Sequence, residues 1–155
     1  MDTGILRAGG GQAVWVVGDH YTIKVSGEET GGAFALIEAV VPPGGGPPPH
    51  VHTREDEAFH VLEGELEFHA DGRSFTAGPG DWVKLAKGSL HDFRNQGRAP
   101  ARVLILVAPA GLERFFLEVG RAANPGDAPA PPTAEEVEKL VSTAPAYGLE
   151  IRPPS

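Results

Sequence analysis

Three histidines and one glutamate have the residue types and the spacing of a metal-binding site. His50 and His52 lie two residues apart in GGGPPPHVHTREDEAFHVLEG (44–64), and Glu57 follows after a short polar segment. In an extended chain, residues two apart point to the same side, so both imidazoles would share one face. If 57–62 forms the adjacent strand, Glu57 can return to that face. Two imidazoles and a carboxylate form a ligand set for Zn, Fe, Mn, Co or Ni.

A fourth candidate ligand, His91, lies downstream in GDWVKLAKGSLHDFRN (80–95). It follows a turn and opens another run with strand character, in which His91, Phe93 and Asn95 share a face. A third imidazole at this position would complete a site of three histidines and one glutamate. We expect Phe93 to form a pocket wall and Asn95 to make structural hydrogen bonds. The alternative for the upstream histidines is a solvated pair near a loop.

The elements that must position these side chains are short strands. The chain holds 21 glycines and 15 prolines, which suits many strands and turns. Asp71-Gly72 predicts a type I′ turn between 65–70 and 73–77. The proline-rich segment 42–49 cannot pair as a central strand, so it is expected to be a stiff link that delivers His50. The runs with strand character are 13–17, 20–25, 33–41, 57–62, 65–70, 73–77, 82–86, 91–95 and 101–108.

Alternation along these strands assigns one set of side chains to the interior. Glu57 and Phe59 share one face and His60 lies on the other, so His60 is not expected to be a ligand. We expect the hairpin to bury Phe68 and Phe75. The interior should therefore hold one metal in a mostly apolar cavity, the usual character of a small-molecule site. The inward set is His50, His52, Glu57, His91, Phe59, Phe93, Val83 and Leu85.

The pattern changes period after residue 108. Leu112, Phe115, Phe116 and Val119 fall at i, i+3, i+4 and i+7, which is one stripe of a helix. This helix is expected to cap the open end of the sandwich. The alternative is that Phe115 or Phe116 lines the mouth of the substrate pocket.

A second helix is predicted after a linker at 123–132. Thr133 and Glu136 form a capping box. A helix this short needs a surface to dock on, in its own subunit or in a partner. Its apolar stripe is Val137, Leu140, Val141 and Ala144.

Composition limits the class of protein. The chain has 155 residues, enough for one domain with a proper core. It has no cysteine, so disulfides and thiolate ligands are excluded. A formal net charge of -8 argues against nucleic acid or an anionic membrane as a partner. No apolar run approaches the roughly 18 residues of a membrane helix, and the first residues lack a signal-peptide pattern, so we expect a cytoplasmic protein.

The candidate ligands also belong to two long sequence motifs. The glycine, HxH, glutamate and glycine of the first cupin motif are present at Gly44, His50, His52, Glu57 and Gly64. The second motif is present at Gly80, Gly88, His91 and Asn95. Ala86 stands where this motif usually has a proline. The chain therefore resembles a cupin over about 33–108.

The strand pattern and this resemblance imply an all-β fold, a double-sheet jelly-roll (cupin) β-barrel with short C-terminal helices. We expect a single domain overall. In it, 1–32 supplies N-terminal strands and a loop that pack on the barrel, 33–108 forms the barrel core, and 109–155 is a C-terminal helical extension. Cupins often pair through their sheets, so we expect a homodimer.

A narrower resemblance concerns the segments APAGLERFFLEVG (108–120) and APAYGLEI (144–151), which look like single-domain quercetin 2,3-dioxygenase-like cupins. It implies a small aromatic or enolic, flavonol-like substrate that binds the metal through its hydroxyl, with O2 as co-substrate. Glu57 would then have a catalytic role besides ligation, as the general base that accepts the hydroxyl proton. The expected cofactor is one divalent transition metal: Fe, Mn, Ni, Co, Zn or Cu.

Three functions remain open from the sequence. The first is a metal-dependent dioxygenase, an oxidoreductase of the quercetinase-like kind. The second is a metal-dependent isomerase, epimerase or hydrolase, although the chain shows little of the lysine and arginine cluster that a sugar phosphate requires. The third is a non-catalytic cupin module that binds metal and a small molecule. Oxygen uptake that depends on substrate separates the first from the other two.

Overall fold

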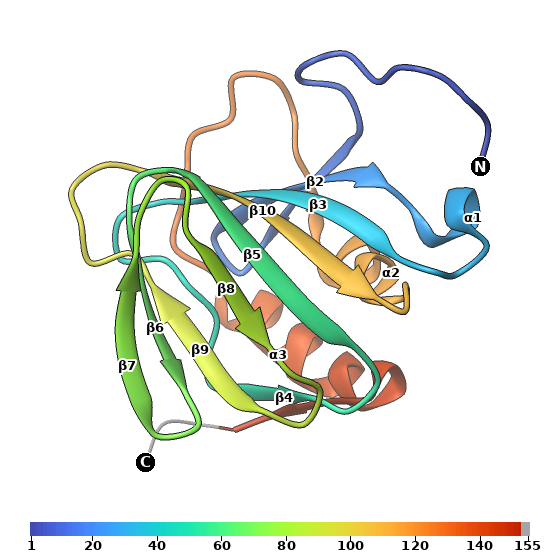
Figure 1. The fold of residues 1–155 in the computed structure, drawn as a ribbon. Helices are drawn as coiled ribbons and strands as arrows, with labels where there is room; N and C mark the ends of the chain where they lie inside the picture. Colours follow the sequence, from blue (N-terminus) through green and yellow to red (C-terminus); the bar gives the residue numbers. More distant parts are fainter. Residues whose placement is uncertain (153–155) are drawn as a thin grey trace.

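The fold, seen in a computed structural model that describes residues 1–152, consists of two antiparallel β-sheets around a common core (Figure 1). The large sheet contains β1 (Gln12–Val16), β2 (Asp19–Val25), β3 (Ala35–Val41), β5 (Asp56–Glu63), β8 (Trp82–Leu85), β10 (Ala101–Ala108) and β11 (Arg121–Ala122). The small sheet contains β4 (His50–His52), β6 (Leu66–Ala70), β7 (Arg73–Ala77), β9 (Leu90–Arg94) and β12 (Leu149–Ile151).

The strand orders are β11-β1-β2-β3-β10-β5-β8 in the large sheet and β12-β4-β9-β6-β7 in the small one. The predicted all-β jelly roll is therefore confirmed, as two separate sheets and not as a closed barrel. The helical segments are α1 (Gly27–Thr30), α2 (Leu112–Val119), α3 (Ala134–Thr143) and the 3₁₀ turn η1 (Ala144–Tyr147). Among the described residues, no helix is long and apolar enough to span a membrane.

The core follows from the alternation of side chains along each strand. In β3, Ala35, Ile37, Ala39 and Val41 are fully buried, and the residues between them are half-buried. β10 alternates in the same way and pairs with both β3 and β5. A strand with one completely buried face and one partly covered face is what a two-sheet sandwich requires.

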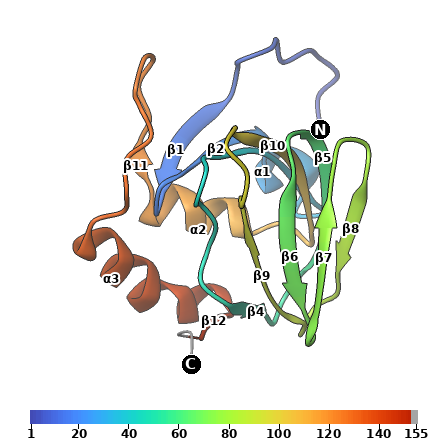
Figure 2. The same cartoon turned by 90° about the vertical axis from the view of Figure 1, so that its left-hand side faces the viewer.

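The C-terminal helices lie at one end of the sandwich. α2 lies between the large sheet and α3 (Figure 2), and it buries Leu112, Phe115 and Val119. The predicted capping box of Thr133 and Glu136 starts α3. The predicted apolar stripe is only partly covered: Leu140 of α3 and Ala144, the first residue of η1, are buried, whereas Val137 and Val141 are 41% and 47% exposed.

The hairpin of β6 and β7 has the predicted turn at Asp71 and Gly72, both with positive φ. Phe68 is fully buried, as expected. The prediction that Phe75 is also buried is wrong, because its side chain is 39% exposed. β7 lies at the edge of the small sheet, so Phe75 has a neighbouring strand on one side only and stacks on Phe68.

Candidate metal centre

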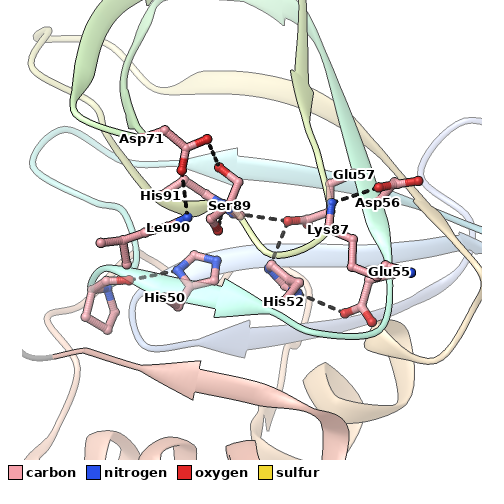
Figure 3. Close-up of polar contacts among 11 residues, drawn as sticks. His50, His52, Glu55, Asp56, Glu57, Asp71, Lys87, Ser89, Leu90 and His91 are labelled. Atoms are coloured by element: carbon pink, nitrogen blue, oxygen red, sulfur yellow. Dashed lines mark hydrogen bonds and ion pairs between the residues drawn. The ribbon is translucent and has the colours of Figure 1, made fainter.

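The four candidate ligands lie together in the interior, with their ligand atoms all within 4.8 Å of one another. His50 and His52 come from β4, Glu57 from β5 and His91 from β9 (Figure 3). Alternation along β4 directs both of its imidazoles inward, and the register of β4 with β9 places His50 opposite His91. All four side chains are buried. The two sheets thus bring together residues that lie 41 positions apart at the extremes, from 50 to 91.

Two of the imidazoles are oriented by backbone carbonyl groups. Nδ1 of His50 lies 2.8 Å from the carbonyl oxygen of Pro48, and Nδ1 of His91 lies 3.1 Å from that of Ser89. A carbonyl oxygen only accepts hydrogen bonds, so Nδ1 carries the proton in both rings. Nε2 is then the nitrogen with a free lone pair, and it is available to a metal. Outer contacts of this kind fix the tautomer and direction of metal-ligating histidines.

His52 is held in the same way, but by a carboxylate. Its Nδ1 lies 2.8 Å from Oε1 of Glu55, which is buried (Figure 3). On its other side, Nε2 of His52 lies 2.8 Å from Oε1 of Glu57, and Nε2 of His91 lies 3.2 Å from the same oxygen. Three imidazole nitrogens and one carboxylate oxygen therefore converge on one point. This donor set and its outer support fit a divalent transition metal.

The charges within the cluster compensate one another. Burial lowers the pKa of His50 to about 3, helped by His52 and His91, so His50 is neutral at pH 7. Burial also opposes a charge on His52, but the carboxylates of Glu57 and Glu55 outweigh burial and raise its pKa to about 9. Burial would raise the pKa of Glu57, yet His52 and His91 hold it well below its usual range. Without a metal, a protonated His52 thus neutralises Glu57.

An apolar cavity of about 50 Å³ adjoins the cluster. His50, His52 and Glu57 form part of its wall. Of the side chains predicted to surround the substrate, the structure places four in this wall: Phe59, Phe93, Phe115 and Phe116. Val83 and Leu85 are buried but do not line it. Both belong to β8 at the edge of the large sheet, where their side chains fill the core away from the cavity.

The rest of the wall was not predicted from the sequence. It consists of Val16, Val17, Tyr21, Pro47, Pro48, Ile105, Leu112, Leu140, Leu149 and Ile151. Alternation along β2 directs Tyr21 inward, so the sequence could have predicted its place in the wall. The sequence could also have predicted a contact of Glu55 with the cluster, since Glu55 lies only three residues after His52 in an acidic segment. No sequence pattern predicts Leu149 and Ile151, because a strand of three residues is too short to show alternation.

The size of the cavity limits what it can hold as it stands. A water molecule needs roughly 10–15 Å³ of such space, whereas small-molecule pockets are typically ~300–1,000 Å³. A volume of about 50 Å³ therefore accommodates a few waters but no aromatic molecule. Part of the wall must move before an aromatic ring can enter. Three wall residues, Leu140, Leu149 and Ile151, belong to the C-terminal segment that covers the cavity.

The chain is similar in sequence to known proteins. Over 150 residues the chain is 25% identical to quercetin 2,3-dioxygenase of Bacillus subtilis, covering 97% of this chain and 44% of that protein. The chain therefore spans less than half the length of that relative. Over 89 residues it is 37% identical to a beta-D-galactosidase of Mycobacterium tuberculosis, covering 56% of this chain and 76% of the relative.

The solved structures and the family model point the same way. A predicted oxalate decarboxylase from Thermotoga maritima is similar with a TM-score of 0.56 and 25% identity, covering 59% of this chain and 80% of that one. Residues 37–107 match the model of the cupin domain, and all four clustered residues fall inside that range. By sequence, by fold and by the place of its histidines and glutamate, this chain belongs to the cupin superfamily.

Proposed function

We propose that this cupin is a metal-dependent dioxygenase that acts on a small aromatic or enolic, flavonol-like substrate. The observation that carries the proposal is the buried cluster of His50, His52, Glu57 and His91 beside an apolar cavity. His50, His52, Glu57 and His91 would hold a divalent transition metal, which would supply Lewis acidity that acidifies a substrate hydroxyl. The similarity to a quercetin 2,3-dioxygenase over 97% of the chain supports the substrate class.

Glu57 is the proposed general base. Of the described residues that line the cavity, it is the one carboxylate. His52 and His91 lower its pKa, so Glu57 is ionised at neutral pH; it is a weak base, and a bound metal that acidifies the substrate hydroxyl would allow the proton to pass to it. Its burial excludes bulk water from the point of transfer. The imidazoles position this carboxylate at the edge of the cavity, where the substrate hydroxyl would lie.

Four phenylalanines are proposed to hold the substrate ring. Phe59 and Phe93 pack edge to face with centroids 5.4 Å apart, and Phe115 and Phe116 come from α2 across the cavity. Aromatic walls suit an aromatic substrate, because ring pairs gain more than their buried area alone provides. They also keep the site dry, which strengthens each polar contact inside it. Substrate access would require the segment of α3 and β12 to move aside.

Oxygen uptake tests the proposal. Protein reconstituted separately with Fe, Mn, Co, Ni and Cu is given quercetin and smaller enolic aromatics. We expect substrate-dependent uptake that disappears in His91→Ala together with most of the bound metal. His69→Ala is the matched control, since His69 contacts Glu67 and Asp92 and is half-buried outside the cluster. Absence of uptake with every metal and every substrate would reject a dioxygenase.

A non-catalytic module is the second candidate, and the small volume of the cavity favours it. Such a protein would bind metal and a small molecule without turnover. It would show a thermal shift with its ligand and no product. An isomerase, epimerase or hydrolase would instead form product without consuming oxygen, and the named activities of the relatives differ enough to include such chemistry in the same assay.

We also propose that the protein is a homodimer that pairs through the outer face of the large sheet. Leu36, Leu104 and Leu106 point outward there and are only half-buried. On the same sheet, Trp82 is 59% exposed and stacks on His60, with the two ring centroids 4.2 Å apart. Light scattering after size exclusion should give a mass of twice the 16.2 kDa of one chain for the wild-type protein. The Leu104→Glu variant should give the mass of one chain. A wild-type monomer would contradict this.

A further inference from the structure

Tyr21 is the one polar side chain, among the described residues that line the cavity, that does not belong to the metal cluster. It comes from β2 and is 4% exposed. Its ring packs on Phe116, with centroids 4.5 Å apart and planes at 46°. Apart from Tyr21 and the cluster, every side chain of the wall is aliphatic or aromatic without a polar group. The Tyr21 hydroxyl is therefore the only side-chain group of this wall, apart from the cluster, that can form a directional hydrogen bond with a bound molecule.

A buried carboxylate lies beside that hydroxyl. Asp19 precedes Tyr21 by two residues on the same strand, so both point to the inner face. Asp19 is 1% exposed, and neither of its oxygens has a hydrogen-bond partner of normal geometry within the described part of the chain. Burial raises the pKa of Asp19 to about 7, against the opposing effects of the Gly46 amide, the charge of Arg94 and the Tyr21 hydroxyl. A buried polar group left in this state is rare and costs stability.

The Tyr21 hydroxyl keeps its proton. Burial, and then the nearby charges of Asp19 and Glu57, raise the pKa of Tyr21 well above its usual value. The hydroxyl is thus a hydrogen-bond donor at any physiological pH. Because Asp19 lacks a hydrogen bond of normal geometry, the Tyr21 proton is not committed to that carboxylate. It is available to an acceptor inside the cavity.

We propose that Tyr21 orients the substrate by donating a hydrogen bond from its hydroxyl. The inference rests on the proposed function and adds a chemical requirement to it. The substrate carries two oxygens, one that reaches the metal cluster and a second that accepts from Tyr21. A ring with a single hydroxyl satisfies only the first contact. A dihydroxylated ring, or one with a hydroxyl and a carbonyl, satisfies both.

Four small phenols measure this requirement. Zinc-loaded protein, in which the metal does not change its redox state, is titrated by calorimetry with phenol, catechol, resorcinol and hydroquinone. At least one diol should bind about 2- to 10-fold more tightly than phenol, the range expected for one added hydrogen bond. Tyr21→Phe should remove this advantage and leave the affinity for phenol unchanged, because the ring that packs on Phe116 is retained.

The chain supplies a matched control in Tyr147, its only other tyrosine. The Tyr147 hydroxyl contacts Glu118 at the surface and does not line the cavity. Tyr147→Phe makes the same chemical change and should leave the diol advantage, the tighter binding of a diol than of phenol, intact. Equal effects of the two substitutions would overturn the role of Tyr21.

The outcomes separate this inference from the proposed function. Oxygen uptake by wild-type protein, combined with an unchanged diol advantage in Tyr21→Phe, would leave the dioxygenase standing and overturn the role of Tyr21. A selective loss of the diol advantage without any oxygen uptake would support Tyr21 as a binding residue of a non-catalytic module. Equal affinity of the wild-type protein for phenol and all three diols would overturn the inference, whatever the oxygen assay gives.

Discussion

Nδ1 of His52 lies 2.8 Å from Oε1 of Glu55, and each of these side chains is only 5% exposed. The other two histidines of the cluster bond through Nδ1 to backbone carbonyls, which no substitution at the acceptor position removes. Glu55 is thus the outer contact of the cluster that can be deleted by changing one side chain.

Glu55→Ala should weaken metal binding. Without its carboxylate, His52 loses the contact that fixes its ring and its basicity. Loss of such an outer contact typically costs about 10- to 100-fold in metal affinity. A competition titration with a chromophoric chelator measures the change.

Glu67→Ala is the control for Glu55. Oε1 of Glu67 lies 2.8 Å from Nε2 of His69, an equivalent carboxylate–histidine contact at the surface. Metal affinity should be unchanged in this variant. Wild-type affinity in Glu55→Ala would show that His52 is oriented by packing alone.

Metal affinity should rise with pH up to about 9. Burial lowers the pKa of His52, but Glu57 and Glu55 outweigh it and raise this pKa to about 9, so at neutral pH His52 holds a proton that the metal must displace. His50, with a pKa lowered to about 3, has no proton to release. Below pH 9, each unit should therefore change the affinity by about tenfold, and the curve should flatten above. Chelator competition between pH 7 and 9.5 checks this, and a flat profile would contradict it.

Gly46→Ala should disturb the link that delivers His50. Gly46 has a φ of +133°, and a Cβ added there would lie 1.9 Å from the carbonyl oxygen of Phe93. The link must move to relieve this clash, which should lower both the free energy of unfolding and the bound metal. Gly44→Ala is the control, since Gly44 has a φ of +79° but open space around it. The Gly44→Ala variant should lose only the free energy of backbone strain, roughly 1–2 kcal/mol of the free energy of unfolding. Urea unfolding with equal losses in both variants would show that the close contact with Phe93 is unimportant.

Leu140→Ala should loosen α3 without unfolding the sandwich. Leu140 is the one residue of α3 that is buried. Amide hydrogen exchange should accelerate over 134–143, and phenols should bind faster, because this residue also closes the cavity. Phe68→Ala is the contrast: Phe68 is fully buried between the sheets, and its loss should cost about 3–5 kcal/mol of global stability. Faster exchange in every strand of Leu140→Ala would mean that α3 unfolds only with the whole protein.

The sequence predicts the metal cluster well because its geometry is mostly local. The spacing of His50 and His52 directs both imidazoles to one side of a strand, and Glu57 begins the strand that follows. Nearly continuous apolar runs also identify long strands such as β3 and β10. Both faces of these strands are apolar in sequence, so the strict alternation between buried and half-buried residues emerges only in the structure.

The parts that the sequence missed depend on which elements become neighbours. Val83 and Leu85 point inward as predicted, yet β8 lies at a sheet edge and their side chains contact the core and not the cavity. Phe75 alternates like a core residue but lies on another edge strand. The pairing of β12 with β4 joins residues that lie 97 to 101 positions apart, and no local pattern marks a partner at that distance.

That pairing also sets the order in which the site can be completed during synthesis. His50 and His52 face Ile151 and Leu149 across β4 and β12. As the chain leaves the ribosome, β4 can pair with β9 once His91 has emerged, but its other edge stays open until residues 149–151 follow. The strand that carries two of the metal ligands is therefore among the last of the described strands to be enclosed, and stable metal uptake is expected only after residues 149–151 have emerged.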